Sequence, residues 1–221
     1  MKKVLLTIVI CAAGIACKAQ SGSSSKDSAL QAAFHRDSLK IENQYAEKAR
    51  WKKLFKVEKF PVINAGRYSG VFPVPGITEI PDSSLQYKLL FGFTQRNPDS
   101  LMNKPDRSLA EIARIINLHA ASGIPLKNIS VVVVIHGPSL HVVSTNASFQ
   151  KNFKMDNPNL KLIKELEKLG TRFIACGQAM DFMGIKKEEL LPEVKVSFTA
   201  QTAFTGYQLK GYVLKNLSPE K

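Results

Sequence analysis

Apolar runs alternate with segments of helical periodicity from residue 87 to the end of the chain. Runs rich in apolar, aromatic and β-branched residues predict five strands, at residues 87–94, 129–136, 171–176, 193–196 and 211–214. Apolar residues that recur every three or four positions predict helices at residues 108–121, 158–169 and 200–209, and a short one that Gly184 closes. This alternation predicts an α/β fold, a three-layer sandwich with a mostly parallel sheet of about five strands.

The pattern changes before residue 85. Apolar residues from Leu30 to Tyr45 recur at intervals of four and seven, which predicts an amphipathic helix. A Ser- and Gly-rich leader at residues 20–26 precedes it and is expected to be flexible. Residues 60–84 carry repeated Pro and Gly and predict an extended arm, with a short edge strand at residues 70–74. We therefore expect residues 20–84 to form a leader, helix and arm, and residues 85–221 to form the α/β domain.

The first 19 residues have the pattern of a secretory signal peptide: a basic start, a short apolar core, then small residues. Cleavage after Ala19 is the favoured interpretation and predicts a periplasmic protein. The alternative is a lipoprotein anchored through Cys17, although Gly14 stands where such processing sites usually carry leucine. Either route exports the chain, and cleavage after Ala19 lowers the formal net charge from +13 to +10 because three lysines and no acid are lost.

Positive charge gathers around Trp51, between Lys48 and Lys59. A basic, aromatic segment of this kind can make peripheral membrane contact, although a solvated helix lying against its own domain is the favoured interpretation. Export argues against nucleic acid as the partner of the basic surface. Only Cys176 remains after processing at Ala19, so the chain cannot form a disulfide within itself.

Polar or reactive residues follow three of the predicted strands. They are Gln95 after the first strand, His136 and Gly137 after the second, and Cys176, Gly177 and Gln178 after the third. Ligand sites in open parallel sheets form outside the carboxyl ends of the strands, where loops lead into helices. The sequence therefore predicts a functional site at this end of the sheet.

Cys176 is the sharpest of these candidates. A sulfur at the first turn of a helix faces unpaired backbone N–H groups and the positive end of the helix dipole, which favour the thiolate form. The ordinary explanation for a lone cysteine is a small buried apolar side chain. A lone thiol in an oxidising compartment is at risk of oxidation. Its presence therefore indicates either that the thiol is buried or that the protein uses it chemically.

The other candidates are weaker. His136 is a possible base or donor beside Cys176, and His119 lies on the predicted helix at residues 108–121; either histidine can equally serve as an ordinary hydrogen-bonded side chain. Met180 and Met183 with Cys176 form a set of soft ligands, but their helical spacing is typical of core residues. No zinc-type spacing, dinucleotide fingerprint or phosphate loop occurs. We therefore expect neither a metal nor a cofactor.

Several segments together resemble the DsrE/DsrF-like (YchN-like) superfamily over about residues 87–217. They are residues 87–94, Asn117-Leu118-His119, residues 131–138 ending in His-Gly-Pro, residues 166–180 with Leu-Gly-Thr-Arg-Phe-Ile-Ala-Cys-Gly-Gln, and Met183-Gly184-Ile185 before Leu191-Pro192. The resemblance implies a flavodoxin-like fold and homo-oligomers, commonly trimers or hexamers.

In sulfur-relay members of that superfamily, the cysteine after the third strand carries a persulfide, and Cys176 is the matching position. The resemblance thus implies a sulfur carrier that exchanges sulfur with donor and acceptor proteins. The alternative is a non-catalytic oligomeric module that binds a small ligand and in which Cys176 is buried. A rhodanese-type enzyme is disfavoured because residues 177–184 contain no Lys or Arg.

Overall fold

The computed structural model describes residues 20–66 and 69–217. The predicted signal peptide and Cys17 lie outside these residues. The chain divides after Lys56 into two units. The first contains α1 (Gln20–Phe55), in which Leu30, Phe34 and Tyr45 are exposed to solvent. The helix begins at Gln20, which corrects the flexible leader expected at residues 20–26: no proline interrupts residues 20–55, so helical hydrogen bonding extends through the serines. Within the described ranges, no helix is both long and apolar enough to cross a bilayer.

The second unit begins with the extended arm, which two asparagines attach to the domain. The Oδ1 atom of Asn117 accepts hydrogen bonds from the backbone N–H groups of Val62 and Ile63, and its Nδ2 donates to the carbonyls of Ile63 and Ser69. Farther along the arm, Asn128 donates to the Ser83 carbonyl. Hydrogen bonds to side chains therefore replace most strand pairing here. The edge strand expected at residues 70–74 is reduced to a single antiparallel bridge between Lys59 and Val71.

The sheet has five parallel strands in the order β4-β3-β2-β1-β5. They are β1 (Tyr87–Phe93), β2 (Ile129–Ile135), β3 (Arg172–Cys176), β4 (Lys195–Ser197) and β5 (Val213–Asn216). The predicted α/β class and parallel sheet are confirmed, and β4 and β5 each lie about two residues later than predicted. As in flavodoxin-like sheets, one strand lies on one side of β1 and three on the other, although here the single strand is the last in the chain.

Helices connect the strands close to the predicted positions. They are α2 (Arg107–Ala121), α4 (Leu160–Lys168), α5 (Gly177–Met183) and α6 (Ala200–Leu209). The sequence patterns missed α3 (Asn146–Phe153), which Thr145 caps, and four 3₁₀ segments: η1 (Asp99–Leu101), η2 (Leu126–Asn128), η3 (Gly137–Val143) and η4 (Lys187–Glu189). These short elements lack a long apolar repeat, so hydrophobic periodicity does not reveal them.

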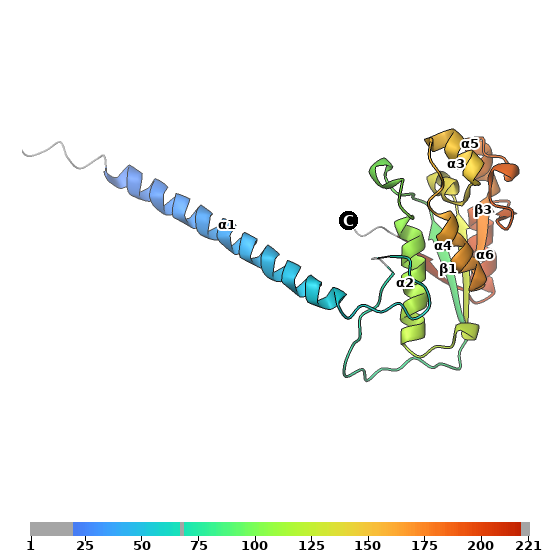
Figure 1. The fold of residues 1–221 in the computed structure, drawn as a ribbon, viewed down its shortest axis with the longest axis horizontal. Helices are drawn as coiled ribbons and strands as arrows, with labels where there is room; N and C mark the ends of the chain where they lie inside the picture. Colours follow the sequence, from blue (N-terminus) through green and yellow to red (C-terminus); the bar gives the residue numbers. More distant parts are fainter. Residues whose placement is uncertain (1–19, 67–68, 218–221) are drawn as a thin grey trace, which may run out of the picture. The chain divides into compact units, whose positions relative to one another are not determined.

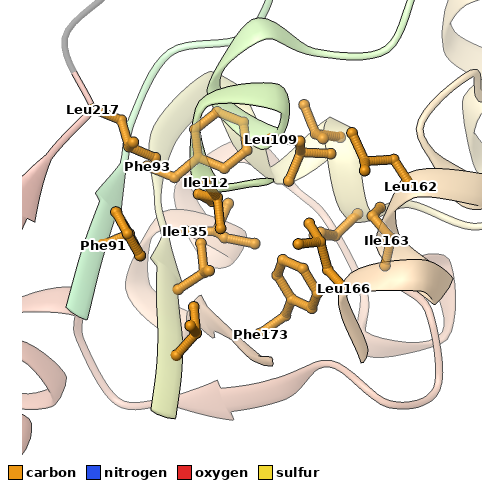
Figure 2. Packing of buried hydrophobic residues seen from close by; sticks show 14 of the residues in the cluster. Phe91, Phe93, Leu109, Ile112, Ile135, Leu162, Ile163, Leu166, Phe173 and Leu217 are labelled. Carbon is orange, nitrogen blue, oxygen red and sulfur yellow. The ribbon is translucent and has the colours of Figure 1, made fainter. Parts of the chain in front are cut away.

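Two apolar cores lie on opposite faces of the sheet, because alternate strand residues point to opposite sides. The larger core lies under α2 and α4 (Figure 1). Figure 2 shows it: side chains of the sheet meet side chains of the two helices, among them Phe91, Phe93, Ile135, Phe173, Leu109, Ile112, Ile163 and Leu166. The smaller core includes Leu90, Val134 and Ile174, with Phe204 of α6 packed against it.

The position of α6 follows from the direction in which the chain travels. From β1 to β4 the strands are added in one direction, and the connection from β4 to β5 runs back across the sheet. Right-handed crossovers require a return connection to cover the opposite face. The helix α6 therefore lies on the face away from α2 and α4, and only two residues, Phe198 and Thr199, separate it from the end of β4.

Candidate functional site

Strand alternation decides which face the sulfur occupies. Phe173 and Ala175 of β3 point into the larger core, whereas Ile174 and Cys176 point into the smaller core beneath α6. Cys176 is the last residue of β3 and is 6% exposed. It is the free cysteine of the described residues. The thiol thus lies at the carboxyl end of the strand, as predicted, but is covered by α6.

The first turn of α6 supplies a hydrogen bond to the sulfur. The backbone N–H of Ala200 donates to Sγ of Cys176, with 3.2 Å between nitrogen and sulfur. Ala200 is the first residue of α6, and the Thr199 side chain caps the same turn by accepting from the Thr202 N–H. A helix N-terminus carries unpaired N–H groups and partial positive charge, so this geometry can stabilise negative charge on sulfur.

This donor differs from the one that the sequence suggested. The expected donors were the amides of the helix that directly follows Cys176. Cys176 is indeed the N-cap of α5, but its side chain makes no capping hydrogen bond there. Side-chain alternation points the sulfur to the α6 face, whereas α5 contributes Met180 to the opposite core. The sequence offered one sign of this donor: Thr199, a typical N-cap residue, precedes the helix predicted at residues 200–209 and marks where its unpaired N–H groups lie.

Gly177 allows the two loops of the site to come together. A Cβ atom at this position would lie 2.8 Å from the carbonyl oxygen of Ser197. The adjacent Gln178 N–H donates to the Phe198 carbonyl at 3.2 Å, which holds the same loop. The side chain of Gln178 is exposed to solvent. Gly177 and the Gln178 backbone therefore position the segment that leads into Ala200.

His136 lies on the same face as the thiol. Its backbone N–H donates to the Phe93 carbonyl of β1 at 3.0 Å. On the other side of β2, Ile135 pairs with Ala175 of β3. Continued by one residue, this register places His136 beside Cys176. The imidazole lies edge-on to Phe204 of α6, with 6.1 Å between ring centroids, and burial lowers its pKa below the ordinary value. Among the described contacts, no hydrogen bond joins the imidazole to Sγ, so a catalytic role of His136 stays a prediction.

The backbone after β2 turns sharply at Gly137, whose φ is +66°. Ser139, which the sequence reasoning did not select, lies close to two carbonyls: its Oγ is 2.6 Å from the Phe93 oxygen and 2.9 Å from the His136 oxygen. A serine shortly after a strand end is typical of such side-chain bonding to a turn. Gly137 and Ser139 thus shape the turn that carries His136.

The loop after β1 departs from the thiol. Gln95 is exposed, and Arg96 turns toward the α3 side, where its guanidinium bonds to Asp99 and lies 5.4 Å from the Phe153 ring. Arg96 and His141 line a cavity of about 10 Å³, which has room for about one water molecule. Burial, and then the positive charge of Arg96, lower the pKa of His141. The three predicted loops therefore do not converge on one site.

His119 lies at the other end of the domain. Its Nδ1 is 2.7 Å from the Ile115 carbonyl oxygen, and its ring lies edge-on to Tyr87, the first residue of β1. The structure thus places His119 away from Cys176, in an ordinary hydrogen-bonded position. Met180 and Cys176 also point into different cores. Across the part of the chain that is described, no three His, Cys, Asp or Glu side chains gather as metal ligands.

The fold and the site define a parallel α/β protein whose single described thiol lies between a strand end and a helix N-terminus. The profile of the DsrE/DsrF-like family matches residues 89–215, more than half of the chain, and the chain belongs to this family. A solved structure of a protein of unknown function from Methanobacterium thermoautotrophicum is similar over 59% of this chain and 98% of its own length, with 21% identity and a TM-score of 0.44. None of the curated proteins compared with the chain matches it.

Proposed function

We propose that this chain is a sulfur carrier in which Cys176 holds sulfane sulfur as a persulfide. The thiolate of Cys176 attacks the outer sulfur of a donor persulfide or polysulfide. A new S–S bond forms on Sγ, the S–S bond of the donor breaks, and the donor departs as a thiolate. The same exchange in reverse, with an acceptor thiolate as the attacking group, releases the sulfur and restores Cys176 without an external oxidant.

One observation carries the proposal: the N–H of Ala200 donates to Sγ at the first turn of α6. A thiolate needs a donor in a site that excludes water, since burying an unpaired charge is costly. Membership of the DsrE/DsrF-like family supports the assignment, because the relay members described above use the matching cysteine. His136, on the same face, is the proposed second polar group of the site.

Burial of the thiol shapes the proposed mechanism. With only 6% of Cys176 exposed, a donor cannot reach Sγ until the segment around Thr199 and Ala200 moves aside. The rate at which a small alkylating reagent labels native Cys176 reports this opening. At saturating reagent the labelling rate equals the opening rate. The rate of sulfur exchange is therefore expected not to exceed this labelling rate.

Intact-mass spectrometry after incubation with polysulfide tests the sulfur carrier. The expected result is a gain of about 32 Da per sulfur that dithiothreitol removes. Cys176→Ser is the matched control and should gain no mass. The proposal fails if the wild-type chain gains no reversible mass, or if the serine variant gains as much.

The burial of Cys176 also favours a second candidate function, a non-catalytic small-ligand or structural module. In that case Cys176 is an apolar core residue beside Phe204 and Leu90. Native Cys176 would then resist a small alkylating reagent and react only after unfolding. Slow labelling together with no persulfide would favour this candidate over the carrier.

We further propose that the carrier works outside the inner membrane, because residues 1–19 have the pattern of a secretory signal peptide. In the periplasm the donor and acceptor are proteins or small molecules that present a persulfide or a thiol. Anchoring through a lipidated Cys17 is the alternative form of the same export. Both forms leave Cys176 as the thiol available for sulfur exchange.

A further inference from the structure

A row of polar side chains crosses the amino end of the sheet, on the face that α6 covers. Lys88 of β1, Ser130 of β2 and Arg172 of β3 each stand two residues before a side chain of the smaller core, so strand alternation points all three to this face. Lys88 pairs with Ser130 in the strand register. Arg172 pairs with Val132, which lies two residues farther along β2. The row therefore has one cation on each side of a hydroxyl group.

The end of α6 adds two aromatic rings and a third cation to this row. The helix is closed by a hydrogen bond from the Tyr212 N–H to the Tyr207 carbonyl at 3.0 Å, with Gly211 at a φ of +83°. This turn brings the rings of Tyr207 and Tyr212 edge to face, with 5.2 Å between centroids. The ammonium of Lys210, in the same turn, lies 5.3 Å from the Tyr207 centroid.

The two cations of the row reach the same pair of rings. The Arg172 guanidinium donates to the Tyr212 hydroxyl at 3.1 Å and lies 5.4 Å from the Tyr207 centroid. The Lys88 ammonium donates to the Lys210 carbonyl at 2.9 Å and lies 6.0 Å from the Tyr212 centroid. Each positive charge is thus at most 6.0 Å from the centroid of one of the two rings. We give the name amino-end cluster to Lys88, Ser130, Arg172 and Lys210.

The charge of the amino-end cluster is not balanced by a carboxylate within the described residues. The ion pairs found there include none of its three cations, and α6 contains no acidic residue. An ammonium has three N–H groups and a guanidinium has five, so the contacts above leave most of these donors available. Ser130 is half-buried, and no described hydrogen bond uses its hydroxyl. Donors and unbalanced positive charge of this kind favour a bound anion.

We infer that the amino-end cluster binds a small oxyanion, the phosphate or sulfate group of a soluble ligand. Arginine and lysine hold such groups through charge-assisted hydrogen bonds, and a hydroxyl supplies a further donor. Because the free groups of the cations can only donate, phosphate and sulfate should bind with similar affinity. Arg172 begins β3 and Cys176 ends it, so the cluster lies at the opposite end of the sheet from the thiol. The inference is therefore independent of the proposed sulfur chemistry.

Isothermal titration calorimetry of the full chain at constant ionic strength tests the site, with inorganic phosphate and then sulfate as the probe. We expect one anion to bind per chain. Arg172→Gln should weaken binding about tenfold or more, because charge-assisted hydrogen bonds are lost. Ser130→Ala removes a hydroxyl and no charge, and it should weaken binding about threefold.

Lys215→Gln is the matched control. Lys215 is exposed on β5 and follows Leu214, which packs on the smaller core, so Lys215 points to the other face of the sheet. This variant loses the same charge as Arg172→Gln but should bind phosphate as the wild type does. Equal weakening by the two variants would overturn the inference, because it would show an effect of net charge alone.

Absence of phosphate and sulfate binding to the wild-type chain would also overturn the inference. Co-sedimentation with phosphatidylcholine vesicles that carry phosphatidic acid separates a lipid head group from a soluble ligand. Vesicle binding that Arg172→Gln abolishes, without binding of the free anions, would contradict the soluble ligand. Circular dichroism checks that the variants fold. If Arg172→Gln does not fold, Ser130→Ala decides, and wild-type affinity of that variant would refute the site.

Discussion

At Gly177 the backbone of α5 lies close to the backbone of the loop after β4, and a methyl group added at Gly177 would collide with the Ser197 carbonyl. We expect Gly177→Ala to displace the loop from Ser197 to Thr199 and to lower the free energy of unfolding by about 1–3 kcal/mol, as overpacking does. The Ala200 donor directly follows this loop, so its displacement should weaken the hydrogen bond to Sγ, and alkylation of Cys176 should also accelerate. Urea denaturation and labelling kinetics measure the two effects.

Gly206→Ala is the control for this prediction. Gly206 lies inside α6, where an added Cβ would meet no atom within 4 Å. Alanine is the better helix former, so this variant should be neutral or more stable by up to about 1 kcal/mol. Equal behaviour of the two alanine variants would show that the approach to Ser197 does not constrain the site.

At the scale of single residues, sequence reasoning located the thiol but not its donor. Cys176 stands out because a β-branched and apolar run ends there and a glycine follows. The partner Ala200 is 24 residues away in the sequence, and its role depends on which face α6 covers. Residue type gives no signal for such a contact, since any residue except proline supplies a backbone N–H.

Among the elements, the arm depends most on one side chain. Asn117 is fully buried and makes four hydrogen bonds to the arm backbone. Asn117→Ala leaves several of these buried groups without a partner, and we expect a loss of about 2–4 kcal/mol in the free energy of unfolding. Denaturant unfolding measures the loss, and limited proteolysis should show earlier cleavage within residues 57–71.

Asn64→Ala is the comparison variant, because the Asn64 side chain is exposed and, among the described residues, accepts a hydrogen bond from the nearby Gly66 N–H. It should change the free energy of unfolding by less than about 0.5 kcal/mol. The attachment would be refuted if Asn117→Ala unfolded at the wild-type midpoint with the arm still protected.

The elements also show what periodicity can and cannot predict. The strands β1, β2 and β3 and the helices α2 and α4 were predicted because each buries a continuous run or stripe of apolar residues. The helix α6 was predicted from a weaker stripe, in which Ala200 is buried and Ala203, Phe204 and Tyr207 are partly buried. The sequence predicted an extended arm with a short edge strand at residues 70–74. The structure has a single bridge there, between Lys59 and Val71, and Asn117 holds the preceding part of the arm through backbone groups of Val62, Ile63 and Ser69. A polar residue within a helical pattern gives no sign in the sequence that its side-chain amide will bond the backbone of a segment far away in the chain.

For the whole molecule, export is the property to test. When the full chain is expressed in a bacterium, the mature protein should begin at Gln20, because small residues at Cys17 and Ala19 suit signal peptidase. Cell fractionation followed by N-terminal sequencing checks this. Ala19→Phe should slow cleavage, since a bulky side chain does not fit where the small residue is required. A mature chain that begins at a lipidated Cys17, or an uncut cytoplasmic chain, would contradict the prediction.

The pairing of β5 with β1 has a kinetic consequence. Leu89 near the start of the domain pairs with Val213 near its end, so nearly the whole domain separates the two strands. Contacts between distant segments form slowly, because loop entropy is lost before the contact stabilises anything. During synthesis the edge of β1 that pairs with β5 stays open until residues 213–216 have left the ribosome. The fifth strand of the sheet can therefore be added only after β5 has been synthesised, and closing this edge of β1 is the pairing step that spans the longest stretch of the domain.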